Sequence, residues 1–194
     1  MGNTLEFRHI TKYFPGVKAL DDVSFLARSG EVLAFLGENG AGKSTLLKTL
    51  NGDYQPTSGQ YLINGEEVRF KSPHEAIEAG VSVIYQERQI LLELNVAENI
   101  YLGRMPVTRL GVIDKRAANK MAQRIIDDFG LPIRPTDKVK DLSVAYQQMV
   151  EIMKAYSRDD LKVICFDEPS ASLSDSEIES LFTIIRKLKR EGKI

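Results

Sequence analysis

The stretch Gly37-Glu38-Asn39-Gly40-Ala41-Gly42-Lys43-Ser44-Thr45 decides the fold of this chain. It follows an apolar run at residues 32–36 and leads into residues 46–50, so the pattern predicts a strand, a glycine-rich loop and a helix. This is the G-x4-G-K-[ST] pattern of a phosphate-binding loop. Glycines let successive backbone N–H groups point at one anion, and the helix N-terminus adds partial positive charge. We therefore expect the chain to bind a nucleoside triphosphate.

Two side chains of this loop carry specific chemistry. Lys43 is expected to reach the β- and γ-phosphates, and the Ser44 hydroxyl to take one position on Mg²⁺. The expected nucleotide-binding residues of the loop are Gly37, Glu38, Asn39, Gly40, Ala41, Gly42, Lys43, Ser44 and Thr45.

Asp167 and Glu168 form a second motif, directly after the apolar run 162–166. In an open α/β sheet, ligands lie beyond the carboxyl ends of the strands. Asp167 is expected to join the magnesium shell, and Glu168 to orient or deprotonate the attacking water. An acidic strand end that only caps a helix is the alternative, and the phosphate-binding loop disfavours it.

Composition narrows the function classes. The chain has 194 residues, 43% of them hydrophobic, and a net charge of −1, which disfavours a nucleic-acid partner. Cys165 is the single cysteine, so no internal disulfide can form, and a buried thiol in a reducing compartment is expected. The N-terminus lacks the features of a signal peptide, and no apolar run approaches the roughly 20 residues that span a bilayer. Any membrane role is therefore expected to come through a partner.

Turn signals and apolar spacing predict an α/β protein whose first 70 residues are mostly strands around one helix. Asn64-Gly65 indicates a hairpin, and Ser72, Asn95, Asp114, Ser143 and Ser174 mark helix starts. The predicted strands are 5–8, 20–27, 31–36, 60–70 (as a hairpin), 81–85 and 162–166, and the later helices are 72–80, 95–100, 114–129, 143–156 and 174–191.

With these two motifs, the chain resembles the nucleotide-binding domain of an ABC ATPase, and the resemblance covers nearly all of the chain. The family signature corresponds to Leu142-Ser143-Val144-Ala145-Tyr146-Gln147, and Gln86 matches the Q-loop glutamine. The resemblance implies a P-loop NTPase of ABC type with a mixed central sheet and flanking helices, an N-terminal antiparallel β subdomain and a helical subdomain. The implied core is 1–84 with 158–194, and 85–157 would hold the Q-loop, helices and signature.

The resemblance also implies roles for single residues. Phe14 would stack on adenine near Val17, with Tyr13 as an alternative to Phe14. Gln86 would contact the metal together with Ser44 and Asp167, and act in catalysis with Lys43 and Glu168. It would also couple the metal site to a membrane subunit through residues 87–94.

Longer stretches resemble the N-terminal half of tandem ATPases of monosaccharide importers for ribose, xylose, arabinose or galactose. These stretches are Phe14-Pro15-Gly16-Val17-Lys18-Ala19-Leu20, residues 96–104 and residues 147–152. The implied partners are a second nucleotide-binding domain on the same polypeptide, transmembrane permease subunits and, indirectly, a sugar-binding protein. The implied location is peripheral, on the cytoplasmic face of the plasma membrane, and the fragment itself is expected to be soluble.

Three departures from the family pattern bear on activity. The signature lacks both glycines and its terminal glutamine, so Ala145 and Tyr146 would add bulk near the γ-phosphate of the opposite domain. The D-loop, residues 171–174, lacks its aspartate. The next strand and the H-loop histidine would follow Ile194, so we expect a truncated domain that binds ATP and hydrolyses it slowly.

Three alternatives remain open at the level of sequence. The altered signature is compatible with a regulatory half whose own site does not hydrolyse ATP. A soluble ABC ATPase acting on ribosomes or DNA would need basic arms or a long coiled coil, and neither is visible. A small-molecule kinase or GTPase shares only the phosphate-binding loop, and the guanine-reading N-K-x-D tetrad is missing.

Overall fold

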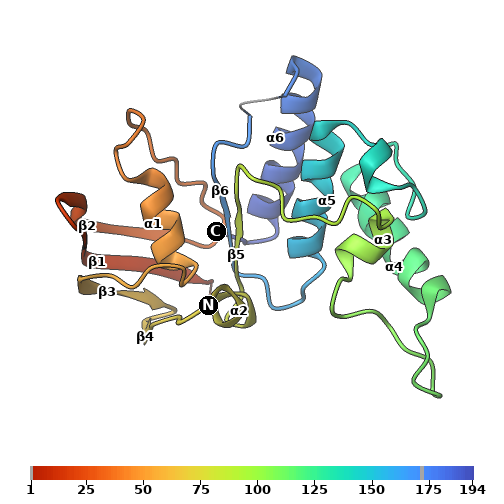
Figure 1. Cartoon of the computed structure of the whole chain (residues 1–194), viewed down its shortest axis with the longest axis horizontal. Coiled ribbons are helices and arrows are strands. Elements are labelled where there is room, and N and C mark those ends of the chain that lie inside the picture. Colours follow the sequence, from red (N-terminus) through yellow and green to blue (C-terminus); the bar gives the residue numbers. More distant parts are fainter. Residues whose placement is uncertain (1, 171–172) are drawn as a thin grey trace. The chain divides into compact units, whose positions relative to one another are not determined.

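A computed structural model describes residues 2–170 and 173–194 and divides the chain into two compact units. The first unit comprises Met1–Val83, Asp160–Asp167 and Ile185–Ile194, and the second comprises Ile84–Asp159 and Glu168–Ile184. Figure 1 labels their helices and strands. Residues 168–184, which the resemblance assigns to the core, cluster with the second unit.

The first unit contains a four-stranded antiparallel sheet in the order β2-β1-β3-β4 (Figure 1). Its strands are β1 (Thr4–Phe14), β2 (Val17–Arg28), β3 (Ser58–Ile63) and β4 (Glu66–Val68). Asn64 and Gly65 join β3 to β4 with φ values of 55° and 81°. Positive φ at both central residues is what a two-residue hairpin turn requires, so the predicted hairpin is confirmed.

An irregularity in β1 explains its burial pattern. Leu5 and Phe7 alternate inward, as a strand of period two demands. The register with β2 then shifts between Phe7 and Ile10, where His9 takes a left-handed φ of 54°. This extra residue returns Ile10 to the inside of the unit, where it is fully buried.

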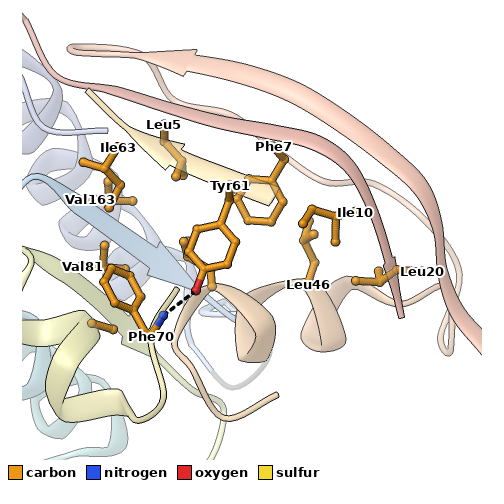
Figure 2. Packing of buried hydrophobic residues seen from close by; sticks show 12 residues of the cluster. Leu5, Phe7, Ile10, Leu20, Leu46, Tyr61, Ile63, Phe70, Val81 and Val163 are labelled. Carbon is orange, nitrogen blue, oxygen red and sulfur yellow. Dashed lines mark hydrogen bonds between the residues drawn. The ribbon is translucent and has the colours of Figure 1, made fainter. Parts of the chain in front are cut away.

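The core of the first unit forms between this sheet and α1 (Lys43–Leu50), with α2 (Pro73–Glu78) and strands β5 (Val81–Ile84) and β6 (Val163–Phe166) contributing further residues. Figure 2 shows Leu46 of α1 beside the apolar side chains of β1 and β2. The Tyr61 hydroxyl is buried and accepts a hydrogen bond from the Phe70 N–H at 3.0 Å, so its oxygen has a partner. The buried cluster consists of Leu5, Phe7, Ile10, Leu20, Leu46, Leu50, Tyr61, Ile63, Phe70, Ala76, Val81 and Val163.

The strand predicted at residues 31–36 is wrong. These residues form no strand, and Val32 and Leu36 are 60% and 94% exposed. A strand needs a neighbour with free backbone groups. Neither described sheet, β2-β1-β3-β4 or β5-β6, includes these residues as a strand.

The second unit is helical, and its helix starts follow the predicted caps. It holds α3 (Val96–Ile100), α4 (Lys115–Phe129), the short 3-10 helix η1 (Val139–Asp141), α5 (Val144–Tyr156) and the first part of α6 (Asp175–Arg190). Asn95 and Glu98 form a reciprocal capping box on α3, and Ser143 caps α5. Gly130 ends α4 in a left-handed conformation, as predicted.

Within residues 2–170 and 173–194, each helix is too short or too polar to cross a bilayer.

Candidate functional site: a nucleotide-binding loop and its acidic partner

The glycine-rich loop enters α1 through Gly42. This residue has a φ of 91°, a left-handed conformation that favours glycine. A Cβ atom placed on Gly42 would lie 2.3 Å from the carbonyl oxygen of Ala19 on β2. Gly42 therefore lets the start of α1 approach β2 more closely than any other residue type would allow.

Lys43 lies across the loop that precedes it. Its ammonium donates hydrogen bonds to the carbonyl oxygens of Gly37 at 2.7 Å and Glu38 at 3.0 Å. The Ala41 N–H donates to the Glu38 oxygen at 3.1 Å and closes the turn. A lysine ammonium has three N–H donors, so one remains for an anion over the loop.

Ser44 and Asp167 meet in the first unit, although the two motifs are far apart in sequence. The Ser44 hydroxyl donates to Asp167 Oδ1 at 3.1 Å, and Asp167 directly follows β6. The contact brings together Ser44 and Asp167, and their expected role in holding a metal with Lys43 nearby stays a prediction.

These oxygens suit a magnesium ion bound together with a nucleotide. Mg²⁺ prefers hard oxygen ligands and takes few of them from protein when phosphates and water supply the rest. Among the described residues, no group of three or more His, Cys, Asp or Glu side chains is placed to hold a metal. A site built from Ser44, Asp167 and phosphate oxygens fits both observations.

Glu168 belongs to the second unit and has an unusual backbone. Its φ is 50°, in the left-handed region that a residue with a side chain rarely adopts, and its side chain is exposed. Backbone strain of this kind gathers at functional positions, where the surrounding structure maintains it. The conformation is consistent with the predicted role of Glu168 in positioning water.

The candidate adenine contact Phe14 has neighbours that the sequence did not indicate. Its ring meets Tyr54 edge to face at 5.2 Å, and Lys12 Nζ lies 5.0 Å from the Phe14 centroid. Tyr13 and Val17 are 49% and 60% exposed. No motif marks Tyr54, so only the fold reveals this aromatic pair. The roles of Phe14, Tyr13 and Val17 towards adenine stay predictions.

The signature begins α5 in the second unit. Ser143 Oγ accepts a hydrogen bond from the Tyr146 N–H at 3.4 Å and donates to Glu177 Oε1 at 3.2 Å. Ala145 is 2% exposed, so its methyl group packs inside the unit, while Val144 is 40% exposed. Leu142 ends η1, and Tyr146 is half-buried. Residues 171 and 172 of the predicted D-loop lie outside the described residues.

A polar cluster that was not predicted from the sequence lies beside the signature. Gln86 is exposed just after β5, and the next residues contact α5. Arg88 Nη1 donates to Gln147 Oε1, and the Gln89 N–H donates to Glu151 Oε1. Helical spacing puts Gln147 and Glu151 on the side of α5 opposite Met149 and Met153, where polar residues are expected, so the sequence held no clear signal.

A family model described as "ABC transporter" matches residues 20–171. The chain is 50% identical over 190 residues to the arabinose import ATP-binding protein AraG of Yersinia pestis, and 49% identical over 190 residues to AraG of Vibrio parahaemolyticus serotype O3:K6. These matches cover 98% of this chain but 36% and 37% of the two relatives, so the chain spans little more than a third of their length.

Solved structures confirm the predicted ABC-type α/β fold. The ADP conformation of MJ1267, an ATP-binding cassette of an ABC transporter, matches with a TM-score of 0.83 and 27% identity, covering 100% of this chain and 79% of that one. CbiO1 of Clostridium perfringens, part of the ABC transporter complex cbiONQ, has a TM-score of 0.81 at 21% identity, covers 99% of this chain and 76% of its own, and supports the fold alone. The chain belongs to the ABC transporter family of ATP-binding domains.

Proposed function

We propose that this chain is the N-terminal nucleotide-binding domain of an importer ATPase for a monosaccharide. The observation that carries the proposal is the 50% identity, over 190 residues, to proteins named for arabinose import. The chain spans 36% of that relative, which supports a second nucleotide-binding domain on the complete polypeptide. The reaction would convert ATP and water to ADP and phosphate and drive sugar uptake.

ATP would be held by the first unit. The backbone N–H groups of residues 37–45 and the remaining N–H donor of Lys43 would bind the phosphates, and Phe14 and Val17 would contact adenine. The Lys43 ammonium would neutralise negative charge that grows on the phosphate oxygens during transfer.

Ser44 and Asp167 would hold the magnesium ion of MgATP, with Gln86 as a further ligand. When bound, the ion supplies positive charge that stabilises the phosphate oxygens. Glu168 would accept a hydrogen bond from the attacking water, orient it towards the γ-phosphate and receive its proton.

The proposed partners follow from the same assignment. The second domain of the complete polypeptide would complete the ATP site, and Ser143 would approach the nucleotide held by that domain. Transmembrane permease subunits would bind on the cytoplasmic face of the membrane, and a sugar-binding protein would deliver the sugar. No nucleic-acid partner is proposed.

A second candidate function is a regulatory domain that binds ATP and does not hydrolyse it. Two features of the signature favour this candidate. The side chain of Val144 is exposed where the family signature has a glycine, and the Ser143 hydroxyl already donates to Glu177, so both alter the surface that would meet the opposite nucleotide. Glu168→Gln in the complete transporter separates the two. Loss of ATPase activity and sugar uptake supports the motor function, and unchanged activity and uptake support the regulatory one.

A further inference from the structure

Helix α5 is buried on more than one side and carries two buried polar side chains besides its buried apolar ones. Met149, Ile152 and Met153 are at most 1% exposed, and Gln147 and Glu151 on the same helix are 6% and 5% exposed. A carboxylate is rarely so deeply buried unless its contacts compensate for the lost hydration. The hydrogen-bond partners of Gln147 and Glu151 therefore show which segment this side of α5 binds.

Both side chains bind the segment that follows Gln86. Gln147 accepts a hydrogen bond from the Arg88 guanidinium, and Glu151 Oε1 accepts one from the backbone N–H of Gln89. Lys154 Nζ donates to the Gln89 carbonyl at 3.4 Å. Residues four apart lie on one side of a helix, so Gln147 and Glu151 present adjacent contacts to two consecutive residues.

The segment 87–94 contains no helix or strand, and both side-chain and backbone hydrogen bonds hold it. The Leu91 N–H and carbonyl both bond to the amide of Asn99, which is 1% exposed. The Leu92 and Leu94 carbonyls accept the N–H groups of Lys140 and Val139. The segment is thereby attached to the residues that lead directly into the signature.

The side chain of Gln147 contacts both the segment 87–94 and the residues that precede the signature. Its Nε2 donates to the carbonyls of Val139 and Leu142 at 3.1 Å each, while its Oε1 holds Arg88. One amide thus joins the residue two positions after Gln86 to the turn that precedes Ser143.

One carboxylate oxygen of Glu151 accepts no hydrogen bond among the described residues. This oxygen, Oε2, is buried. A buried carboxylate oxygen without a partner destabilises the fold, whereas an apolar side chain of similar volume would not. Packing alone therefore gives no reason for a glutamate at this position.

We propose that Glu151, together with Gln147, is a positioning residue that makes the segment 87–94 and the start of α5 move as one body. The inference rests on the proposed function, in which Gln86 responds to nucleotide and Ser143 faces the opposite nucleotide. A displacement of residues 87–94 would then reach the signature through two side-chain contacts of α5, without passing through the nucleotide.

The first test measures the connection itself, by hydrogen–deuterium exchange on the complete polypeptide. Glu151→Met keeps the side-chain volume and removes both oxygens, whereas Glu151→Gln keeps the acceptor for the Gln89 N–H. Glu179→Gln, at an exposed position of α6, is the control. We expect Glu151→Met to accelerate exchange about tenfold in both 86–94 and 138–148, and Glu151→Gln to restore most of the protection. Acceleration confined to 86–94 would overturn the proposal.

The second test measures function in proteoliposomes containing the complete transporter and its binding protein, with L-arabinose, D-ribose, D-xylose and D-galactose as probes. We expect Glu151→Met to bind ATP normally and to lower sugar uptake per ATP hydrolysed about fivefold or more. Unchanged uptake per ATP, or a parallel loss of ATPase and uptake with lowered thermal stability, would overturn the positioning role. If the unmodified transporter imports none of the four sugars, the proposed function fails instead, and the exchange experiment still decides the connection.

Discussion

The Ser44 hydroxyl donates a hydrogen bond to Asp167 Oδ1 at 3.1 Å, across 123 residues of sequence. Ser44 stands in the first turn of α1, and Asp167 directly follows β6. The contact brings a hydroxyl and a carboxylate together next to Lys43 in the sequence, which is the arrangement that the proposed phosphate and magnesium contacts require.

Asp167→Asn is expected to weaken the magnesium dependence of ATP binding and leave magnesium-free binding nearly unchanged. The amide keeps the acceptor for Ser44 but lacks the negative charge that attracts the ion. We expect the ATP affinity measured with Mg²⁺ to fall about tenfold, and the affinity measured with EDTA to change little. Asp159→Asn, at an exposed position of the second unit, is the control. Equal affinity of Asp167→Asn and the unmodified chain in Mg²⁺ would exclude the carboxylate from the metal site.

Gly42→Ala and Gly40→Ala form a matched pair that tests the entry into α1. Both glycines have positive φ, but a Cβ on Gly42 would meet the Ala19 carbonyl at 2.3 Å, and a Cβ on Gly40 would meet nothing within 4 Å. We expect Gly40→Ala to lower the free energy of unfolding by about 1 kcal/mol and Gly42→Ala by roughly 3 kcal/mol, measured by urea denaturation. Similar losses for the two variants would show that the close approach to β2 is unimportant.

Phe14→Ala is expected to weaken ATP binding about tenfold, because a stacked aromatic ring contributes roughly 1–3 kcal/mol per base. Tyr13→Ala is the matched variant, since Tyr13 is the neighbouring aromatic and is half exposed. We expect Tyr13→Ala to change the affinity little. Fluorescence titration with a labelled ATP analogue measures both, and a larger effect at Tyr13 would assign the adenine contact to that residue.

Local signals in the sequence were sufficient for most elements. Asn64-Gly65 could specify a hairpin because its turn depends on backbone freedom at two adjacent residues. Ser143 could mark the start of α5 because a cap involves only its own first turn. The contact of Ser44 with Asp167 was predictable because ligands in an open α/β sheet lie beyond the carboxyl ends of the strands.

Features that depend on distant neighbours were not predictable in this way. The apolar run at 32–36 satisfied the local pattern of a strand, but no neighbour among the described residues supplies it with a ladder. The contact of Phe14 with Tyr54 and that of Gln89 with Glu151 join residues that no spacing rule connects. Helical spacing places Glu151 opposite the apolar side that holds Met149 and Met153, so its burial was not predictable from the sequence.

Glu151 makes stability depend on pH in a direction that can be measured. Burial raises the pKa of Glu151, and the hydrogen bond from Gln89 and the charges of Lys154 and Arg88 lower it by less. The folded chain therefore keeps this proton to a higher pH than the unfolded chain does. Its contribution to stability is largest below the unfolded pKa of about 4.3 and is lost as pH rises through the folded pKa.

Glu151→Gln should remove the loss of stability that accompanies ionisation of Glu151 at higher pH. We expect the free energy of unfolding of the variant at pH 7.5 to exceed that of the unmodified chain by about 1 kcal/mol, with a smaller difference near pH 4.5. Urea denaturation at the two pH values measures it, and Glu179→Gln controls for a change of net charge. A variant less stable than the unmodified chain at pH 7.5 would show that the buried carboxylate stabilises the fold.

Calorimetric titration of the chain with MgATP tests the central claim most directly, because it reports nucleotide binding without requiring hydrolysis or a partner. We predict saturable binding of one ATP, reduced about thirtyfold or more by Lys43→Ala, which removes a charge-assisted contact to phosphate. Lys120→Ala, at an exposed position of α4, should leave the affinity unchanged. Equal ATP affinity in the unmodified chain and Lys43→Ala would contradict the assignment of residues 37–45 as the nucleotide-binding loop.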